Sequence, residues 1–256
     1  MTASPPLPPA VPDSPLTPLL TAAEALVPGM AGVLGGPAPG HVTAGQDNAA
    51  ALTALIDAIT ATAGEGEAAY VAVTAWGMLV WQPAILTLLA VHRFGLVPDL
   101  GGMSQRVHGA SVYGYRLPPE PAAMAMPPAD LIRAGGQQLR ALADSLLAEL
   151  QRHVRLKPVL ARRLLADRVV STVARPEFAA AEVTALVEQW LAALDLAGCS
   201  GVMPVPLSGG RTVMALDRRA CCLAYRVGGN DMCITCPRQS DSLRLERLQT
   251  YWEAHV

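Results

Sequence analysis

The stretch AAYVAVTAWGMLVWQPAILTLLAV, residues 68 to 91, decides the fold, because it holds no charged residue and is long enough to cross a bilayer. A membrane span and a core helix must therefore be compared. Gln82 and Pro83 interrupt the run, and no cluster of Lys or Arg flanks either end to set an orientation in a membrane. The sequence favours a kinked or broken pair of helices in a large core over a membrane span.

Helical patterns lie on both sides of this apolar run. The segments TPLLTAAEALV and QDNAAALTALIDAITATA precede it and are rich in good helix formers. Downstream, apolar residues recur at helical spacing in 139–150 and in 183–194, and a further helix is expected around 158–173. The chain closes with SDSLRLERLQTYWEAH, a predicted helix that Ser240 or Asp241 can cap.

Strands are predicted in two places. The segment QRVHGASVYGYRLP combines β-branched and aromatic residues with glycines, and TVMALD and ACCLAYRV read as strands after Gly198. We expect an α+β fold, mostly helical, with a small antiparallel or mixed sheet that carries both the cysteine strand and the region near Tyr113. The predicted organisation is a disordered Pro-rich arm at 1–18, a body at 19–210 and a C-terminal segment at 211–256.

Composition narrows the function. At 256 residues, with 52% hydrophobic and 16% charged residues, the chain can bury a large core, and its net charge of −2 disfavours nucleic acid as a partner. Residues 1–100 hold one basic side chain, Arg93, so any basic surface belongs to the C-terminal part. The start, MTASPPLPPAVPDSPLTP, lacks the positive region and apolar run of a secretory signal, which indicates a cytoplasmic protein.

Four of the five cysteines lie close together near the C-terminus: Cys221, Cys222, Cys233 and Cys236. Clustered thiols in a reducing compartment point to metal binding or catalysis rather than to disulfides. Their spacing is Cys-Cys-x10-Cys-x2-Cys, and Gly228 and Gly229 allow the intervening loop to turn. Four thiolates suit a tetrahedral zinc or a [2Fe–2S] cluster. The adjacent cysteines Cys221 and Cys222 cannot easily both reach a single zinc atom, which favours the cluster. The spacing alone, however, distinguishes a zinc site from a [2Fe–2S] cluster only in part.

The segment RRACCLAYRVGGNDMCITCP resembles the C-terminal signature of the FhuF-type ferric siderophore reductases. The two agree in both cysteine gaps, the preceding arginine, the aromatic residue after the pair, the glycines and the final Cys-Pro. The resemblance implies that the four cysteines hold a [2Fe–2S] cluster, with no catalytic residue beyond it. Outside this segment it is limited to the apolar region near MLVWQPAILTLLA and to general length. Ile234 and Thr235 differ from the family pattern, so hydrogen bonds to the sulfur atoms need not follow it.

The same resemblance implies a function in iron homeostasis. The expected reaction is one-electron reduction of a ferric hydroxamate siderophore in the cytoplasm, which releases Fe(II). No Gly-rich dinucleotide fingerprint follows a strand, so we expect electrons from a ferredoxin or an NAD(P)H-dependent ferredoxin reductase. Two alternatives stay open. One is a [2Fe–2S] electron-transfer protein with another acceptor, with peripheral membrane association as a variant, and the other is a zinc-binding interaction module that uses the four cysteines.

Other residues in the chain have simpler interpretations. Four arginines flank the thiols and form either a solvated basic rim or a docking patch for an acidic electron donor: Arg218, Arg219, Arg226 and Arg238. Cys199 is expected to be an inert core thiol. Four aromatic residues are expected to pack in the core and strands rather than to contact a siderophore: Trp76, Trp81, Tyr113 and Tyr115.

Overall fold

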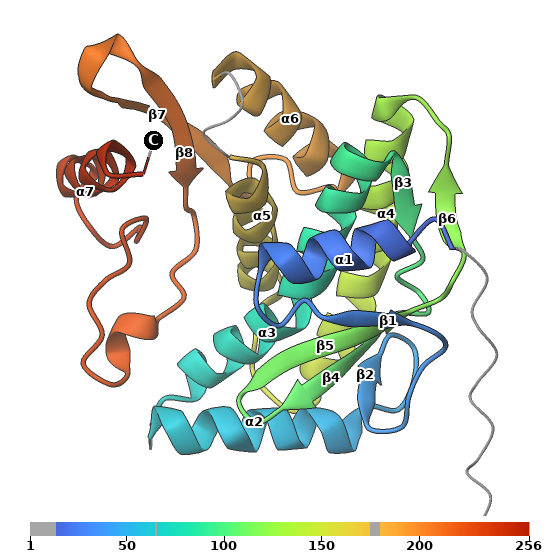
Figure 1. Cartoon of the computed structure of the whole chain (residues 1–256). Coiled ribbons are helices and arrows are strands. Elements are labelled where there is room, and N and C mark those ends of the chain that lie inside the picture. The colour runs from blue at the N-terminus through green and yellow to red at the C-terminus, as the bar shows by residue number, and fades with distance from the viewer. Residues whose placement is uncertain (1–13, 65, 175–179, 256) are drawn as a thin grey trace, which may run out of the picture.

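The fold is built around one long helix. The computed structural model describes residues 14–64, 66–174 and 180–255, and in it the long apolar run forms helix α3 (Ala68–Leu89). Figure 1 shows α3 at the centre of the helical body. The other helices of the body are α1 (Thr17–Leu26), α2 (Ala49–Ala63), α4 (Pro128–Leu150), α5 (Pro158–Val173) and α6 (Ala180–Ala193). These positions confirm the helices predicted from periodicity.

Helix α3 is continuous, so a break into two helices at Gln82 and Pro83 is wrong, while a kink there stays a prediction. An internal proline costs about 3 kcal/mol, but α3 packs against α1, α2, α4 and α5, and this burial offsets the cost. Gln82 is fully buried with its amide satisfied: its Nε2 donates to Gly29 O at 2.8 Å, and its Oε1 accepts from Gln105 Nε2 at 3.2 Å. A polar residue thus ties α3 to its neighbours instead of interrupting it.

The helical run continues past α3 into a short π-helix, η1 (Ala90–Phe94). Together they form the span 68–94, the one candidate in the described residues that is long and apolar enough to cross a bilayer. Within its most apolar 18-residue stretch, 78% of the residues are buried inside the protein. This burial agrees with the preference for a core helix.

Short sheets accompany the helices. The largest has four strands in the order β1-β5-β4-β2, with β1 parallel to β5 and the other neighbours antiparallel. Its strands are β1 (Gly32–Leu34), β2 (His41–Thr43), β4 (Ser104–His108) and β5 (Ser111–Leu117). Two antiparallel pairs complete the set: β3 (Leu96–Pro98) with β6 (Pro121–Met124), and the hairpin of β7 (Gly201–Pro206) and β8 (Thr212–Asp217). The mostly helical α+β class, with small mixed and antiparallel sheets, is confirmed.

The cysteines and Tyr113 do not share a sheet, contrary to prediction. Tyr113 lies on β5 of the four-stranded sheet, whereas the cysteines follow β8 of a separate pair. The segment ACCLAYRV is not a strand either: it is irregular apart from a 3-10 turn, η3 (Ala224–Arg226). The backbone turns at Leu223, whose φ is 60°, and again at Gly228 and Gly229, whose φ values are 65° and 68°. Positive φ is incompatible with an extended ladder, so no strand runs through this segment, and β8 has already ended at Asp217.

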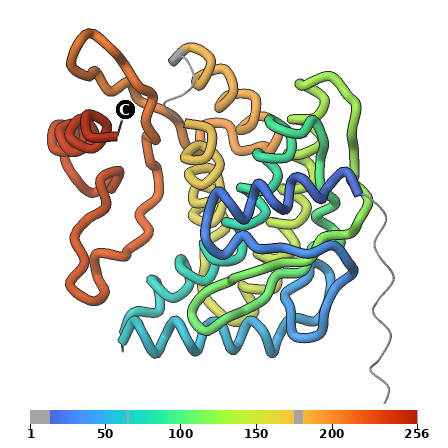
Figure 2. The backbone as a smooth tube through the Cα atoms, viewed as in Figure 1, coloured from blue at the N-terminus to red at the C-terminus, as the bar shows by residue number. Residues whose placement is uncertain are grey.

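The C-terminal segment stands beside the helical body. Figures 1 and 2 show the β7–β8 hairpin, the cysteine loop and α7 (Asp241–Glu253) on one side of it, with α5 and α6 at the junction. A second, small core lies between the hairpin and α7. Ser240 caps α7 as predicted, since its Oγ accepts from Leu243 N at 3.3 Å. The boundary proposed at residues 210 and 211 falls in the turn between β7 and β8, and the division into domains stays a prediction.

The last residues of the predicted N-terminal arm, 14–18, are ordered in the structure. Residues 1–13 lie outside the described residues, but α1 already begins at Thr17. Leu16 is fully buried, and Ser14 Oγ donates to Pro119 O at 2.5 Å. The burial of Leu16 and this long-range hydrogen bond order residues 14–18, although two of these residues, Pro15 and Pro18, are prolines.

The aromatic residues mostly pack as expected. Trp76 and Tyr115 are almost fully buried, and Trp81 Nε1 donates to Val112 O at 3.2 Å; Tyr113 is 42% exposed. Trp76 Nε1 donates to Ala161 O at 2.9 Å, a buried bond that fixes α5 against α3. This contact matters for the site, because α5 carries the residues that hold the cysteine segment.

Candidate metal centre

The segment between β8 and α7 brings the four predicted thiols together in two contacting pairs. Among the thiols, Cys221 interacts most with Cys236, and Cys222 interacts most with Cys233, and each interaction shifts a thiol pKa within its pair. Cys236 is buried, and the other three are partly buried. The separation of ten residues between the second and third cysteines is therefore bridged by a loop that folds back on itself.

The Cys-x2-Cys part forms a tight turn. Cys236 N donates to Cys233 O at 2.9 Å, which closes the turn around Ile234 and Thr235. Gln239 Nε2 donates to the same carbonyl of Cys233 at 2.8 Å and ties the turn to the start of α7. The last helix thus fixes the position of the third and fourth thiols.

A buried carboxylate on α5 fixes the other end of the segment. Asp167 is 1% exposed and accepts hydrogen bonds from Ser200 Oγ at 2.6 Å and from the backbone amides of Arg219 and Ala220, both at 3.2 Å. Burial raises the pKa of Asp167, while these hydrogen bonds and the charge of Arg218 oppose that rise. The residues directly before Cys221 are therefore anchored to the helical body.

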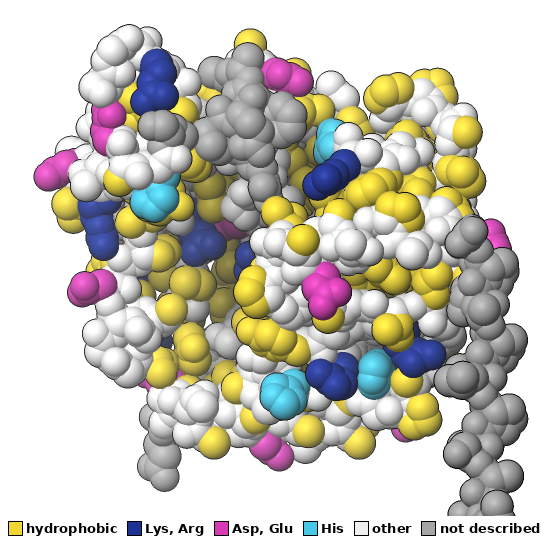
Figure 3. All heavy atoms as spheres, viewed as in Figure 1, with side chains coloured by type: hydrophobic (Ala, Val, Ile, Leu, Met, Phe, Trp, Pro, Cys, Tyr) yellow, Lys and Arg dark blue, Asp and Glu magenta, His cyan; other side chains and the backbone are white. Residues whose placement is uncertain are grey.

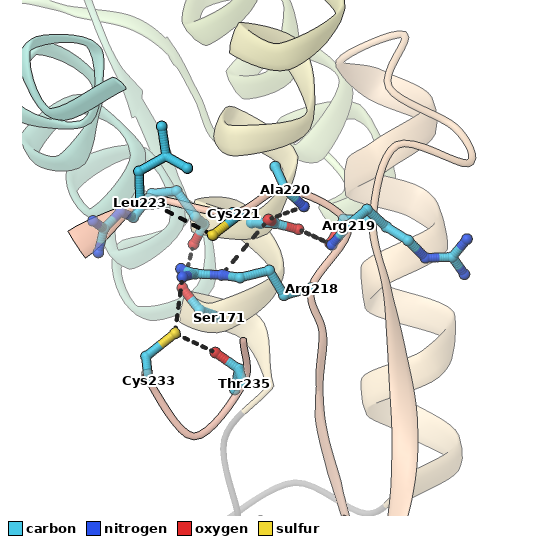
Figure 4. A network of polar contacts seen from close by, with 11 residues as sticks. Ser171, Arg218, Arg219, Ala220, Cys221, Leu223, Cys233 and Thr235 are labelled. Atoms are coloured by element: carbon cyan, nitrogen blue, oxygen red, sulfur yellow. Dashed lines mark hydrogen bonds and ion pairs between the residues drawn. The ribbon is translucent and has the colours of Figure 1, made fainter. Parts of the chain in front are cut away.

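Arg218 links this carboxylate to the thiols. Its Nη1 donates to Cys233 Sγ at 3.6 Å, and its Nε lies 3.7 Å from Asp167 Oδ2, an ion pair too long for a hydrogen bond. Figure 4 shows the Arg218 side chain reaching toward Cys233, while Arg219 points away from the cysteines. Of the flanking arginines, Arg218 is thus the one directed at the sulfur atoms.

The surroundings of the thiols favour negative charge on one sulfur, that of Cys222. The hydrogen bond from Cys233 lowers the pKa of Cys222, with help from the backbone amide of Ala224 and the charge of Arg218. Donation of that proton raises the pKa of Cys233. Burial raises the pKa of Cys221, although Leu223 N donates to its Sγ at 3.4 Å. Backbone amides and a guanidinium are the donors that stabilise thiolate ligands.

The donor set fits a two-iron centre. Within the described ranges, no three His, Cys, Asp or Glu side chains converge where a single metal ion could be held. The thiols contact instead as two pairs. A [2Fe–2S] cluster takes four thiolates spread over two irons, whereas a structural zinc needs all four around one atom. Cys233 also lies 3.9 Å from Thr235 Oγ1, so a residue that departs from the family pattern contacts a sulfur.

The remaining flanking arginines have partners on the surface. They pair as follows: Arg219 with Asp217 at 3.1 Å, Arg226 with Glu67 at 3.1 Å, and Arg238 over the ring of Tyr225 at 5.5 Å. The predicted basic rim therefore consists of separate, exposed contacts rather than one cluster. Cys199 packs against the main core after α6, as expected for a core thiol.

Comparison with protein-family models gives a match at the C-terminal segment. Residues 218–238 match the family model described as the FhuF 2Fe-2S C-terminal domain. The matched residues include all four thiols and lie between β8 and α7. The match confirms the resemblance seen in the sequence and the [2Fe–2S] cofactor that it implied. No solved structure matches the chain.

One residue of the site was missed in the sequence. Asp167 lies on α5, about fifty positions before the thiols. The available signal is its place in LLADRVV, where two charged residues interrupt an apolar stretch of a predicted helix. Fully buried Asp is rare unless it is paired, so a carboxylate there indicates a specific partner.

Proposed function

We propose that the protein is a cytoplasmic ferric siderophore reductase that reduces a Fe(III)-hydroxamate complex by one electron and so releases Fe(II). The observation that carries this proposal is the arrangement of four thiols as two contacting pairs in a segment that matches the FhuF 2Fe-2S domain. A membrane-spanning alternative is disfavoured by the burial of α3.

The ligands that we propose are Cys221, Cys222, Cys233 and Cys236. Each contacting pair would supply two thiolates to such a cluster. When bound, the [2Fe–2S] cluster supplies reversible storage of one electron. The chain's own residues then neutralise the negative charge of the thiolates: Arg218 and the amide of Leu223 donate toward sulfur. A zinc module built on the same four cysteines fits the pairing less well, because a single zinc needs the four sulfurs around one point.

The chemistry of the substrate explains why one electron is enough. Hydroxamate oxygens are hard ligands that hold Fe(III) strongly and Fe(II) weakly. Reduction therefore converts a trapped ion into one that exchanges, and no covalent catalysis is needed.

The electron donor that we propose is a ferredoxin or an NAD(P)H-dependent ferredoxin reductase. Cys221 and Cys222 are partly exposed, so an electron donor can approach these two thiols from solvent. Exposed arginines around the segment, Arg219, Arg226 and Arg238, would attract an acidic partner.

A single-turnover experiment tests this function. Chemically reduced protein is mixed anaerobically with a ferric hydroxamate and an Fe(II) trap, and visible absorption and trapped Fe(II) are followed together. We expect about one Fe(II) per reduced protein, in step with reoxidation. A matched reaction with the Cys199→Ser variant should behave alike. Protein that stays reduced for minutes with no trapped Fe(II) would refute the proposal.

A further inference from the structure

A pocket opens beside the thiols, between α3, α5 and the segment before Cys222. Its volume is about 160 Å³. The residues that matter in its lining are Thr74, Gly77, Met78, Arg168, Arg218 and Cys222. The apolar lining comes mainly from α3, where Gly77 leaves space, and the cationic lining comes from α5 and from the residue that donates to Cys233.

The positive charge that lines the pocket is not fully neutralised by nearby carboxylates. Two guanidinium groups, those of Arg168 and Arg218, line it together. Within the part of the chain that the structure describes, the Arg168 guanidinium has no hydrogen bond or ion pair. Arg218 has one carboxylate, Asp167, at 3.7 Å, and that carboxylate already accepts three other hydrogen bonds.

Bringing two like charges into a partly buried pocket costs free energy in the unliganded protein. Burial and the charge of Arg218 lower the pKa of Arg168, in accord with that cost. An anion placed between the two groups would offset the repulsion and give both guanidinium groups the acceptors that they lack.

The size and surroundings of the pocket limit what it can hold. Complete small-molecule sites usually measure roughly 300–1,000 Å³, so 160 Å³ suits one arm of a chelate rather than a whole complex. Figure 3 shows the surface hollowed between the C-terminal segment and the helical body, with Lys or Arg side chains inside the hollow. The bulk of a chelate can lie in that hollow while one arm enters the pocket.

We propose that this Arg168 pocket binds a carboxylate arm of the ferric chelate and so selects anionic over cationic hydroxamate complexes. The inference rests on the proposed function and adds the substrate class to it. Cys222 lines the same pocket, so a chelate anchored there by its arm lies against one of the four thiols. A planar guanidinium can receive a carboxylate through two parallel hydrogen bonds, which fixes the arm in one orientation.

Binding can be measured without electron transfer. Gallium(III) is redox-inert and takes the place of Fe(III) in hydroxamate complexes. Two probes form a matched pair: the gallium complex of desferrioxamine B, which ends in a protonated amine, and that of its N-succinyl derivative, which ends in a carboxylate. Titration of the full-length holoprotein with each probe, followed by calorimetry or tryptophan fluorescence, gives both dissociation constants.

We expect the succinyl complex to bind at least about tenfold more tightly than the amine complex, since hydrogen bonds to charged groups are worth about 1.5–3 kcal/mol. Arg168→Gln should remove this preference, and Arg168→Lys should keep part of it. Arg163→Gln removes an exposed charge from the same helix and should keep all of it. Far-ultraviolet circular dichroism and the visible spectrum check that each variant is folded and loaded.

The outcomes separate this inference from the function on which it rests. Equal binding of the two gallium complexes to the unaltered protein, or a preference that survives Arg168→Gln, would overturn the pocket assignment whatever the Fe(II) assay gives. If Arg168→Gln does not fold, the salt dependence of the preference in the unaltered protein decides, because a charge-based preference must shrink as salt rises. A clear gallium preference without Fe(II) release from either ferric complex would keep the pocket and reject the reductase.

Discussion

Arg218 Nε lies 3.7 Å from Asp167 Oδ2, and Nη1 of the same arginine donates to Cys233 Sγ at 3.6 Å. One arginine thus connects a buried carboxylate of the helical body with a thiol of the C-terminal segment. Asp167 also holds the amides of Arg219 and Ala220, so the body positions both the guanidinium and the backbone that leads to Cys221. The environment of the thiols is therefore set from α5, outside the segment that contains them.

Asp167→Asn should loosen this connection. The amide keeps the shape but loses the charge and one acceptor, so we expect unfolding to become easier by about 1–3 kcal/mol. The reduction potential of the holoprotein should become more positive, because Arg218 keeps its charge without the balancing carboxylate. Denaturant titration and redox titration measure the two effects.

The matched control for this variant is Asp144→Asn. Asp144 pairs with Arg140 on the surface, with its side chain 66% exposed, so this change should alter stability little and the potential not at all. An unchanged potential in Asp167→Asn would show that Asp167 does not act on the thiols through Arg218.

The two thiol pairs give a prediction about ligand variants. If Cys221 and Cys236 serve one iron and Cys222 and Cys233 the other, serine variants should fall into two spectroscopic classes. The electron paramagnetic resonance spectra of Cys221→Ser and Cys236→Ser should resemble each other more than either resembles Cys222→Ser.

Loss of a thiolate ligand should also make the cluster labile in each of the four variants, so all of them should bleach faster than the unaltered protein. Cys199→Ser is the control, because Cys199 packs against the main core and is not one of the four paired thiols. Iron loss in Cys199→Ser together with a normal spectrum in Cys221→Ser would contradict the ligand assignment.

Arg238→Glu tests the docking of the electron donor. Arg238 is exposed and lies over Tyr225, so it can meet a partner without supporting the thiols. Reversal of a rim charge mainly lowers the association rate, and we expect reduction by a ferredoxin-type donor to slow by up to about tenfold at low salt. Reoxidation by an uncharged ferric hydroxamate should change little. Stopped-flow kinetics measures both, with Arg133→Glu, an exposed arginine on α4, as the control. Similar slowing by the two variants would count against a docking patch at Arg238.

The apolar helix gives a prediction about fractionation. Because most of the apolar stretch of α3 is covered by other helices, the overexpressed protein should stay in the supernatant without detergent after membranes are sedimented. Full recovery in an alkaline-washed membrane pellet would mean that α3 is inserted in a bilayer.

Periodicity was a reliable guide to α4 and α6, because each buries one apolar face. The helix expected around 158–173 lies at Pro158–Val173, and the terminal helix begins after Ser240 as predicted. Short strands could not be predicted in the same way: β1, β2 and β3 have three residues each, too few for an alternating pattern to appear. Their pairing depends on the strands beside them rather than on their own sequence.

The thiols could be predicted from spacing and resemblance, but their supports could not. The strand expected in ACCLAYRV fails because a backbone turn at Leu223 overrides the β-propensity of the segment. Arg218 was one of four flanking arginines with nothing in the sequence to distinguish it. Only the fold, which places Asp167 beside it, separates this arginine from the exposed ones.

Metal and sulfide analysis of anaerobically purified protein tests the central claim most directly. Two thiol pairs that hold a [2Fe–2S] cluster predict a reddish-brown protein with about two irons and about two labile sulfides per chain, and without zinc. Colourless protein with about one zinc per chain and no labile sulfide would contradict the account, because four thiolates around one zinc form a structural site that carries no electron.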